Sequence, residues 1–158
     1  MLRILLLIVS LAISGAAQAQ ARVGETAPAF DTRLLDGKSL PAAALKGKAV
    51  LVVFWATWCP ACQKELPELQ KLYEKYRSRG FEILALSVDA DAFTVEEFWK
   101  DHDYGFPVAM RAPQHAKVFG GIRGTPTLFI LDRQSALRMA HIGALGLQQL
   151  EAKLLPFL

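Results

Sequence analysis

The sequence predicts an α/β fold in which helices flank one mixed central sheet. Residues 50–55 and 81–88 form two unbroken or nearly unbroken apolar runs, a pattern typical of strands that helices cover on both faces. A helical pattern follows the first run, and further strand and helix patterns alternate after the second. The chain closes with two apolar runs joined by a tight turn and a last helix, which completes an α/β sandwich.

The first nineteen residues have the composition of a secretory signal peptide. Arg3 supplies a positive charge, residues 4–13 are apolar apart from one serine, and Ala17-Gln18-Ala19 fits a cleavage site. The apolar stretch is shorter than the roughly 20 residues of a membrane span, so we expect cleavage after Ala19. An uncleaved anchor is the alternative. In either state the folded domain, residues 20–158, would face an extracytoplasmic space, where disulfides can persist.

The size and charge of the rest of the chain indicate one domain that does not bind nucleic acid. About 139 residues remain after the signal segment, which is the size of a single domain. The formal charge of the whole chain is +3, and its lysines and arginines do not form a continuous basic run. Neither an internal repeat nor a low-complexity linker interrupts the sequence.

The segment before the first buried strand predicts a β-hairpin. Residues 30–40 contain Asp36-Gly37, a strong signal for a tight turn between two strands. Residues 41–47 then connect the hairpin to the strand over 50–55.

A long helix is expected directly after that strand. Cys59 stands at its N-cap, and Pro60 suits the first helical position because the missing N–H is not needed there. Gly80 is expected to end the helix, and Pro67 is expected to kink it. The apolar face of this helix consists of Leu66, Leu69, Leu72, Tyr73 and Tyr76.

The second half continues the alternation. After the strand over residues 81–88, Thr94 with Glu97 three positions later fits a capping box that opens a helix. The remaining expected elements are an extended piece over 107–110, a short helix over 114–119, strands over 125–132 and 137–143, and a closing helix around Leu147, Leu150 and Leu154.

Cys59 and Cys62 are the only cysteines. They could form a structural disulfide, bind a metal or haem, or act as a redox-active pair, and their spacing does not favour these uses equally. A structural disulfide would close a loop of only four residues and would constrain the unfolded chain little. A zinc site needs further cysteine or histidine ligands at fixed spacing, which the three histidines do not provide. Haem attachment needs a histidine where Gln63 stands. A redox-active pair fits best.

The expected position of Cys59 at a helix start suits a nucleophilic thiolate. The first turn of a helix presents unsatisfied N–H groups and a partial positive charge, and both lower the pKa of a thiol. Cys62 lies about one turn further along and is expected to be more buried. It can resolve a mixed disulfide by attacking Cys59. The redox-active disulfide is the only redox group expected, with no separate cofactor and no metal.

Several stretches resemble a known family. VLVVFWATWCPAC resembles the active-site strand and turn of thioredoxin, and GIRGTPTLFILD with the C-terminal residues is similar to its C-terminal half. The N-terminal GETAPAFDTRLLDGKSLPAAALKGKAVLV, the CQKELPEL segment and residues 89–113 resemble the TlpA/ResA branch of thiol-disulfide oxidoreductases. Over roughly residues 23–158, the resemblance implies a thioredoxin-like fold with an N-terminal β-hairpin extension and a central insert.

The resemblance also assigns site residues. Cys59 would be the nucleophile and Cys62 the resolving thiol. Pro126 matches the cis-proline that lies against the cysteines in this family. The residues expected to contact substrate are Trp58, Pro60, Thr125 and Pro126.

One acidic position completes the expected catalytic group. Val53 stands where thioredoxin keeps a buried aspartate, whereas Glu65 matches an acidic position of the TlpA/ResA branch. Because burial raises the pKa of a thiol, Cys62 needs a base, and we expect Glu65 to accept its proton.

Several of these residues also have a purely structural interpretation. Trp58 could belong to the core, and Glu65 could be a solvated carboxylate near Lys64. The histidines, His102, His115 and His141, are expected at the surface or hydrogen-bonded in the core. The aromatic residues Phe98, Trp99 and Phe106 would pack the insert or line a substrate groove.

The resemblance implies a monomeric periplasmic reductant of protein disulfides that a membrane-embedded electron donor recharges. Its substrates would be apocytochrome c, copper-site assembly proteins or other oxidised proteins, and the sequence leaves the choice among them open. The residues between the two cysteines do not fix the reduction potential.

Two other functions fit the sequence less well. A thiol peroxidase of the peroxiredoxin class shares the broad fold, but it has proline and threonine or serine where this chain has Val52 and Ala56. A copper-binding assembly chaperone of this fold uses a longer cysteine spacing and a distant histidine ligand, which Cys59-Pro60-Ala61-Cys62 does not supply.

Overall fold

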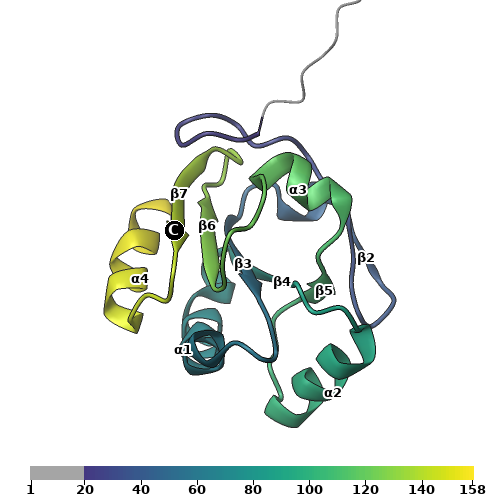
Figure 1. Cartoon of the computed structure of the whole chain (residues 1–158). Coiled ribbons are helices and arrows are strands. Elements are labelled where there is room, and N and C mark those ends of the chain that lie inside the picture. The colour runs from purple at the N-terminus through teal and green to yellow at the C-terminus, as the bar shows by residue number, and fades with distance from the viewer. Residues whose placement is uncertain (1–19) are drawn as a thin grey trace, which may run out of the picture.

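The structure is a computed structural model that describes residues 20–158 (Figure 1). The expected signal segment, residues 1–19, lies outside the described residues. Among the described residues, every helix is too short or too polar to cross a membrane.

A five-stranded mixed sheet forms the centre of the molecule, with strand order β5-β4-β3-β6-β7. β3 (Ala49–Trp55) lies in the middle, parallel to β4 (Phe81–Ser87) and antiparallel to β6 (Thr127–Leu131). β5 (Val108–Met110) continues the sheet parallel to β4, and β7 (Leu137–Ile142) is antiparallel to β6. This arrangement confirms the predicted mixed sheet.

Helices cover both faces of the sheet (Figure 1). α1 (Pro60–Tyr76), α2 (Ala92–His102) and α4 (Leu147–Leu154) pack on one face, and α3 (Pro113–Phe119) and the 3-10 helix Ala42–Leu45 on the other. Successive residues of β3 therefore enter two different cores, and its whole length is buried, as its unbroken apolar run predicted. The α1 side receives Leu51, Val53 and Trp55, and the α3 side receives Val50, Val52 and Phe54.

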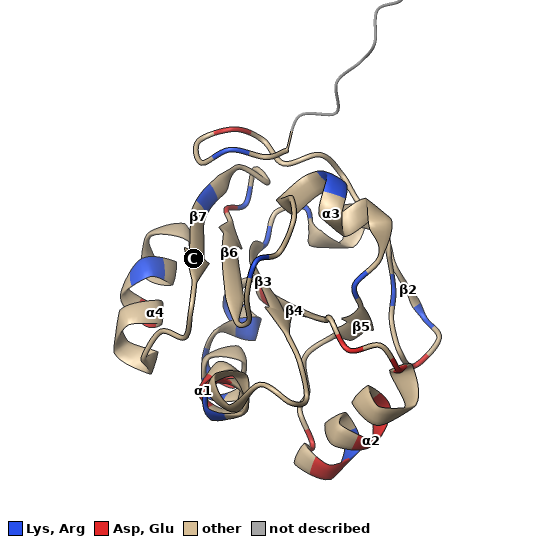
Figure 2. Ribbon diagram, in the orientation of Figure 1, with Lys and Arg blue, Asp and Glu red and all other residues tan. Residues whose placement is uncertain are grey.

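Charged residues are distributed unevenly over the sheet, helices and loops (Figure 2). Lysine and arginine are spread over several helices and loops, whereas α2 carries Glu96, Glu97 and Asp101 with a single lysine, Lys100.

α1 begins where the sequence predicted, and the helical segment that continues it ends at the predicted Gly80. Cys59 is its N-cap, Pro60 is its first residue, and Pro67 lies inside it without interrupting it. The last turn, Arg77–Arg79, is a 3-10 helix that ends at Gly80 in the left-handed region, with φ of 80°. Glycine adopts this conformation without a Cβ clash, which explains the end of the helix there.

The predicted N-terminal hairpin is present with short strands. β1 (Thr32–Arg33) pairs with β2 (Ser39–Leu40), and Gly37 takes a φ of 82° in the turn. The Leu35 N–H donates to the Val108 carbonyl at 3.0 Å, so the hairpin covers the β5 edge of the sheet.

The predicted start of α2 is wrong. The helix begins at Ala92 with Asp91 as its N-cap, three residues before the Thr94 that the sequence pattern assigned. The Asp91 carboxylate accepts from the Thr94 N–H at 2.9 Å and from the Thr94 hydroxyl at 2.8 Å. Thr94 therefore donates to the N-cap residue instead of being it, because aspartate is the more favoured residue at an N-cap.

His115 is a hydrogen-bonded core residue, one of the two placements expected for it. Its Nδ1 accepts from the Ala112 N–H at 3.0 Å, and its Nε2 lies 3.0 Å from Thr32 Oγ1. Since Nδ1 accepts, the neutral ring carries its proton on Nε2 and donates to Thr32. The imidazole thereby joins α3 to the hairpin, and its ring makes a T-shaped contact with Phe30.

This buried histidine should make the protein less stable in acid. Burial, helped by the charge of Arg111, lowers the pKa of His115 from 6.5 to about 4. Between these values the unfolded chain binds a proton that the folded protein does not, so the free energy of unfolding falls as the pH is lowered. The full loss is roughly 3 kcal/mol.

Urea unfolding of wild type and His115→Gln at several pH values checks this expectation. The stability advantage of wild type should shrink as the pH falls from about 7 to about 4. An imidazole that titrates near pH 6.5 in the folded protein by NMR would contradict it.

Candidate active site

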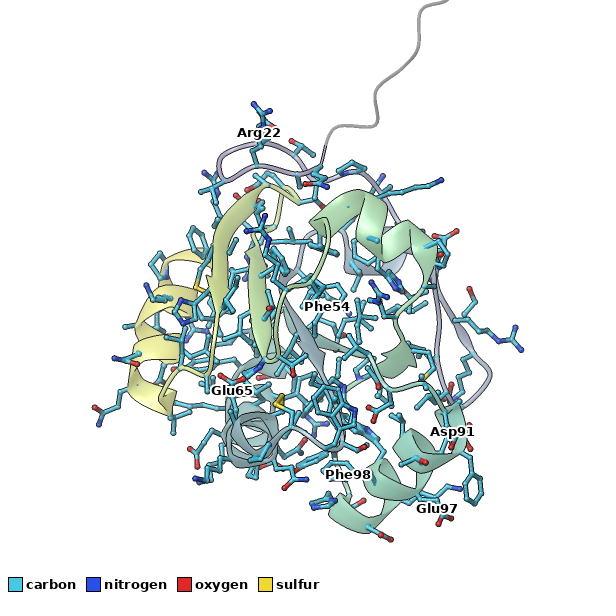
Figure 3. The ribbon with its side chains drawn as sticks, in the orientation of Figure 1. Arg22, Phe54, Glu65, Asp91, Glu97 and Phe98 are labelled. Carbon is cyan, nitrogen blue, oxygen red and sulfur yellow. A yellow bond between two sulfur atoms is a disulfide. The ribbon has the colours of Figure 1, made fainter. Side chains whose placement is uncertain are left out.

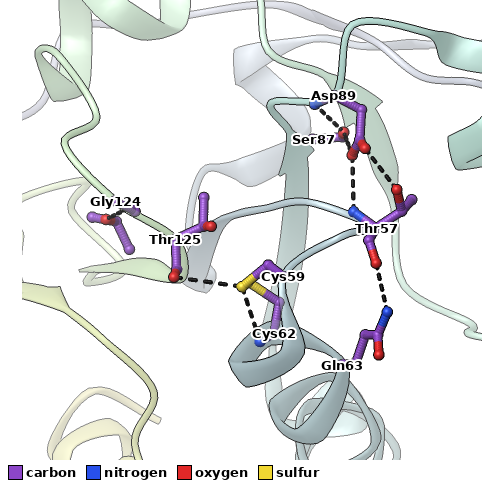
Figure 4. Close-up of a disulfide and its surroundings, with 9 residues drawn as sticks. Thr57, Cys59, Cys62, Gln63, Ser87, Asp89, Gly124 and Thr125 are labelled. Atoms are coloured by element: carbon purple, nitrogen blue, oxygen red, sulfur yellow. Dashed lines mark hydrogen bonds between the residues drawn. A yellow bond between two sulfur atoms is a disulfide. The ribbon is translucent and has the colours of Figure 1, made fainter.

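Cys59 and Cys62 form a disulfide at the junction between β3 and α1 (Figure 4). Their Cα atoms are 5.3 Å apart, and both residues are buried, with Cys59 4% and Cys62 1% exposed. β3 ends at Trp55, four residues before Cys59, and α1 begins at Pro60. The CxxC motif therefore lies at the N-terminus of α1, as predicted.

The backbone around Cys59 favours a negative charge on its sulfur. The Cys62 N–H donates to Cys59 Sγ at 3.2 Å, and this N–H belongs to the first turn of α1. In the reduced protein the same N–H and the helix dipole stabilise a thiolate at Cys59. The geometry agrees with Cys59 as the nucleophile, and Cys62 is the more buried of the two residues.

The segment before β6 lies against the disulfide. The Thr125–Pro126 peptide bond is cis, as the resemblance implied, and the Thr125 carbonyl oxygen lies 3.4 Å from Cys59 Sγ. A disulfide sulfur carries no proton, so this is a close contact, whereas a reduced Cys59 thiol can donate to the same carbonyl. The Gly143 N–H donates to the Pro126 carbonyl at 2.8 Å and ties this segment to the end of β7.

Trp58 is a surface residue, so the interpretation that places it in the core is wrong. It is 67% exposed, and Pro60 beside the disulfide is exposed as well. Ile142 is 60% exposed and borders Gly124, one residue before Thr125. Large apolar side chains without cover at this edge suit contact with another protein.

Glu65 is buried, which contradicts the interpretation of a solvated carboxylate. Figure 3 shows it on α1, on the side that faces α4. Only 4% of the residue is exposed. Its Oε1 accepts from the Leu145 N–H at 2.8 Å, and its Oε2 is one of two buried side-chain polar atoms among the described residues without a hydrogen-bond partner.

Burial raises the pKa of Glu65 from 4.5 to about 7, although the hydrogen bond from Leu145 acts in the opposite direction. A carboxyl group with a pKa near neutrality can both accept and return a proton under ordinary conditions. Glu65 lies three residues after Cys62 on the same helix, within reach of a neighbouring side chain or a bridging water. The structure therefore agrees with the expected proton acceptor, and the role itself stays a prediction.

The aromatic residues of the insert pack against the strand that carries the site. Trp55, at the end of β3, has its ring 5.3 Å from Phe98 and 5.2 Å from Trp99. Trp99 is in turn 5.0 Å from Phe106, and His102 stacks on Phe98 at 4.1 Å. Packing of the insert, one of the two expected roles, is the one that these contacts support.

Sequence reasoning missed two features beside the disulfide. The sequence did not indicate that Ile142 is exposed at the site, because an apolar residue at the end of a strand is usually part of the core. Asp89, which binds Thr57 in the turn before Cys59, reads as an ordinary polar residue after a strand. Its position at the carboxyl end of β4, beside the motif-bearing β3, was the available signal.

Across residues 20–158, acidic, histidine and cysteine side chains do not gather in any group of three or more that could hold a metal ion.

Comparison with known proteins identifies relatives over most of the chain. The model of the family described as Redoxin matches residues 22–154. The thiol-disulfide oxidoreductase ResA of a Bacillus cereus strain is 38% identical over 135 residues, which cover 84% of this chain and 77% of ResA. ResA of Halalkalibacterium halodurans is 33% identical over 131 residues, which cover 83% of this chain and 74% of that protein.

Solved structures resemble the chain over a similar range. A thiol:disulfide interchange protein of the thioredoxin family from Chlorobium tepidum superposes with a TM-score of 0.78 at 31% identity, covering 88% of this chain and 99% of that one. StoA from Bacillus subtilis superposes with a TM-score of 0.69 at 25% identity, covering 81% of this chain and 97% of that one.

Proposed function

The chain belongs to the Redoxin family and is a thioredoxin-like thiol-disulfide oxidoreductase of the ResA type, and on this premise we propose that it reduces protein disulfides outside the cytoplasm. The observation that carries the proposal is the Cys59–Cys62 disulfide at the start of α1, in contact with the Thr125 carbonyl. This arrangement supports the proposal, because the first turn of α1 would stabilise a Cys59 thiolate and Cys62 is close enough to attack a mixed disulfide at Cys59.

The proposed reaction moves two electrons in two exchange steps. The Cys59 thiolate attacks a substrate disulfide, so one substrate sulfur leaves as a thiolate and a mixed disulfide forms. Cys62 then loses its proton and attacks Cys59, which breaks the mixed disulfide and releases the second substrate thiolate. The substrate ends as a dithiol and the enzyme as the Cys59–Cys62 disulfide. We assign the proton of Cys62 to Glu65, whose raised pKa suits this transfer.

Protein substrates would dock at the edge that carries the disulfide. Trp58 and Pro60, the sequence neighbours of Cys59, are exposed, and the Thr125 carbonyl lies against the Cys59 sulfur. An extended substrate segment can pair with the backbone at Thr125 while its own side chains contact the exposed indole. Pro126 fixes the direction of this backbone.

The N-terminal segment supports the proposed cellular setting. A signal-like sequence supports export to the periplasm, or tethering to the membrane if the segment stays uncleaved. A reductant outside the cytoplasm needs electrons from within, so we propose a membrane-embedded donor as the partner that reduces the Cys59–Cys62 disulfide. The proposed substrates are oxidised cysteine pairs of apocytochrome c or of metal-site assembly proteins, and the proposed state is a monomer.

Trapping and redox titration test this proposal together. Cys62→Ser expressed in cells should accumulate mixed disulfides with exported proteins, and mass spectrometry after non-reducing separation identifies them. The double variant Cys59→Ser with Cys62→Ser is the matched control and should trap nothing. A reductant should have a potential nearer to about −270 mV, the thioredoxin value, than to about −120 mV, the value of a strong oxidant. A strongly oxidising potential would contradict the direction of electron flow.

A further inference from the structure

We infer that Asp89 is a positioning residue for disulfide exchange, because its carboxylate holds Thr57 and so fixes the turn that presents Trp58 and Cys59. The inference rests on the proposed attack by Cys59 and on substrate contact at Trp58. It adds a residue from the loop after β4 to a site that is otherwise built from the turn before α1, from α1 and from the segment before β6.

The turn in question joins β3 to α1. The Cys59 N–H donates to the Ala56 carbonyl at 3.2 Å, so residues 56–59 form a turn with Thr57 and Trp58 at its centre. Trp58 is 67% exposed, and its side chain therefore has little packing to hold it. The position of the indole therefore depends mainly on the backbone of this turn, whereas the Cys59 sulfur is also held by the first turn of α1.

Asp89 binds the turn through two hydrogen bonds (Figure 4). Its Oδ2 accepts from the Thr57 N–H at 3.0 Å, and its Oδ1 accepts from the Thr57 hydroxyl at 2.6 Å. The carboxylate is itself oriented by Ser87, which is fully buried: the Ser87 hydroxyl donates to Asp89 Oδ2 at 2.6 Å and accepts from the Asp89 N–H at 2.9 Å.

α1 holds the same residue from the other side. The Gln63 side chain donates to the Thr57 carbonyl at 2.6 Å, and the Gln63 N–H donates to the Cys59 carbonyl at 3.0 Å. All three polar groups of Thr57, its N–H, hydroxyl and carbonyl, are therefore occupied by partners outside the turn. The turn is fixed to the end of β4 and to the first turns of α1 together.

This arrangement matters most for large substrates. A protein disulfide must meet the Cys59 sulfur while its neighbouring residues contact Trp58 and Thr125, so a small displacement of the turn removes several contacts at once. A small disulfide approaches the sulfur alone and needs no such alignment. Loosening the turn should therefore affect the two kinds of substrate differently.

Thr57→Val and Asp89→Asn test the inference with insulin as the protein disulfide and dithiobis-nitrobenzoate as the small one. We expect each variant to lower kcat/KM for insulin about tenfold, the effect of one hydrogen bond to a charged group. The rate with the small disulfide should stay within about twofold of wild type. Thr57→Ser keeps the hydroxyl and should restore the insulin rate.

Thr94→Val is the matched control. Thr94 donates its N–H and its hydroxyl to Asp91 in the same way, but at the start of α2. This variant should leave both rates unchanged. Equal losses for both substrates, or unchanged insulin rates in Thr57→Val and Asp89→Asn, would overturn the inference. Failure of wild type to reduce insulin would instead overturn the proposed function, and Thr57→Val, the smaller change, remains informative if Asp89→Asn does not fold.

Discussion

Replacing Cys59 with serine is expected to lower disulfide exchange to the rate of the protein-free reaction, whereas replacing Cys62 should stop exchange halfway. Cys59 is the N-cap of α1, and its sulfur accepts the Cys62 N–H at 3.2 Å. Serine at this position has no accessible anion near neutral pH and cannot form a mixed disulfide. Cys62→Ser keeps the attacking thiolate but removes the group that releases the substrate.

Stopped-flow assays with a disulfide substrate separate these two outcomes. Cys62→Ser should give one rapid burst of thiol release per protein molecule and no turnover, and Cys59→Ser should give neither. Brief alkylation of the reduced wild type followed by peptide mapping is the independent check, because Cys59 should react before Cys62. Turnover by Cys59→Ser, or faster labelling of Cys62, would reverse the two assignments.

The central sheet was predictable because buried parallel strands leave an unmistakable pattern. The apolar runs over residues 50–55 and 81–88 differ by one residue from β3 (Ala49–Trp55) and β4 (Phe81–Ser87). The pattern works here because helices cover both faces, so no polar residue is needed on either side of β3. Local signals were weaker at the start of α2, where Asp91 and Thr94 are both good N-cap residues and only tertiary structure chooses between them.

The site was predictable in its chemistry and less so in its surroundings. Cys59 and Cys62 are found from their spacing and from the helix start expected at Pro60, because the first turn of a helix lowers the pKa of a thiol. The exposure of Trp58 and the burial of Glu65 both depend on neighbours distant in sequence, namely the loop at Leu145 for the carboxylate. The hydrogen bond from Thr57 to Asp89 connects the residues that follow β3 and β4. These two strands become neighbours only in the folded sheet, so the hydrophobic pattern of the sequence could not reveal the hydrogen bond.

Glu65→Gln should change the stability of the oxidised protein in a pH-dependent way. The pKa of Glu65 is raised from 4.5 to about 7 by burial, so between these values the folded protein binds a proton that the unfolded chain does not. Wild type therefore loses stability as the pH rises through this range, by up to roughly 3 kcal/mol, and the glutamine variant avoids the loss. His115 has the opposite effect between pH 6.5 and about 4.

Glu65 and His115 change the free energy of unfolding in opposite directions as the pH rises. The informative quantity is therefore the difference in free energy of unfolding between variant and wild type, measured with urea. Glu65→Gln should gain stability relative to wild type between about pH 4.5 and pH 8. Glu68→Gln is the matched control, since Glu68 lies on the same helix but pairs with Lys71 at the surface. A constant difference across the pH range would contradict the raised pKa of Glu65.

The same substitution should slow the release of substrate from the mixed disulfide. Cys62 must lose its proton before it can attack, and ionised Glu65 is the acceptor that we assign. In wild type this step should accelerate as the pH rises through about 7, where Glu65 becomes ionised. Glu65→Gln should be slower by about a hundredfold near neutral pH, the lower end of the effect of a general base.

Single-turnover release from preformed mixed disulfides, measured across the pH range, decides this point. The rates of Glu65→Gln and wild type should converge at high pH, where hydroxide can deprotonate Cys62 without help. Glu68→Gln should follow wild type throughout. If Glu65→Gln also follows wild type, the buried carboxyl serves only to bind the Leu145 N–H and hold the loop before α4, and another group accepts the proton of Cys62.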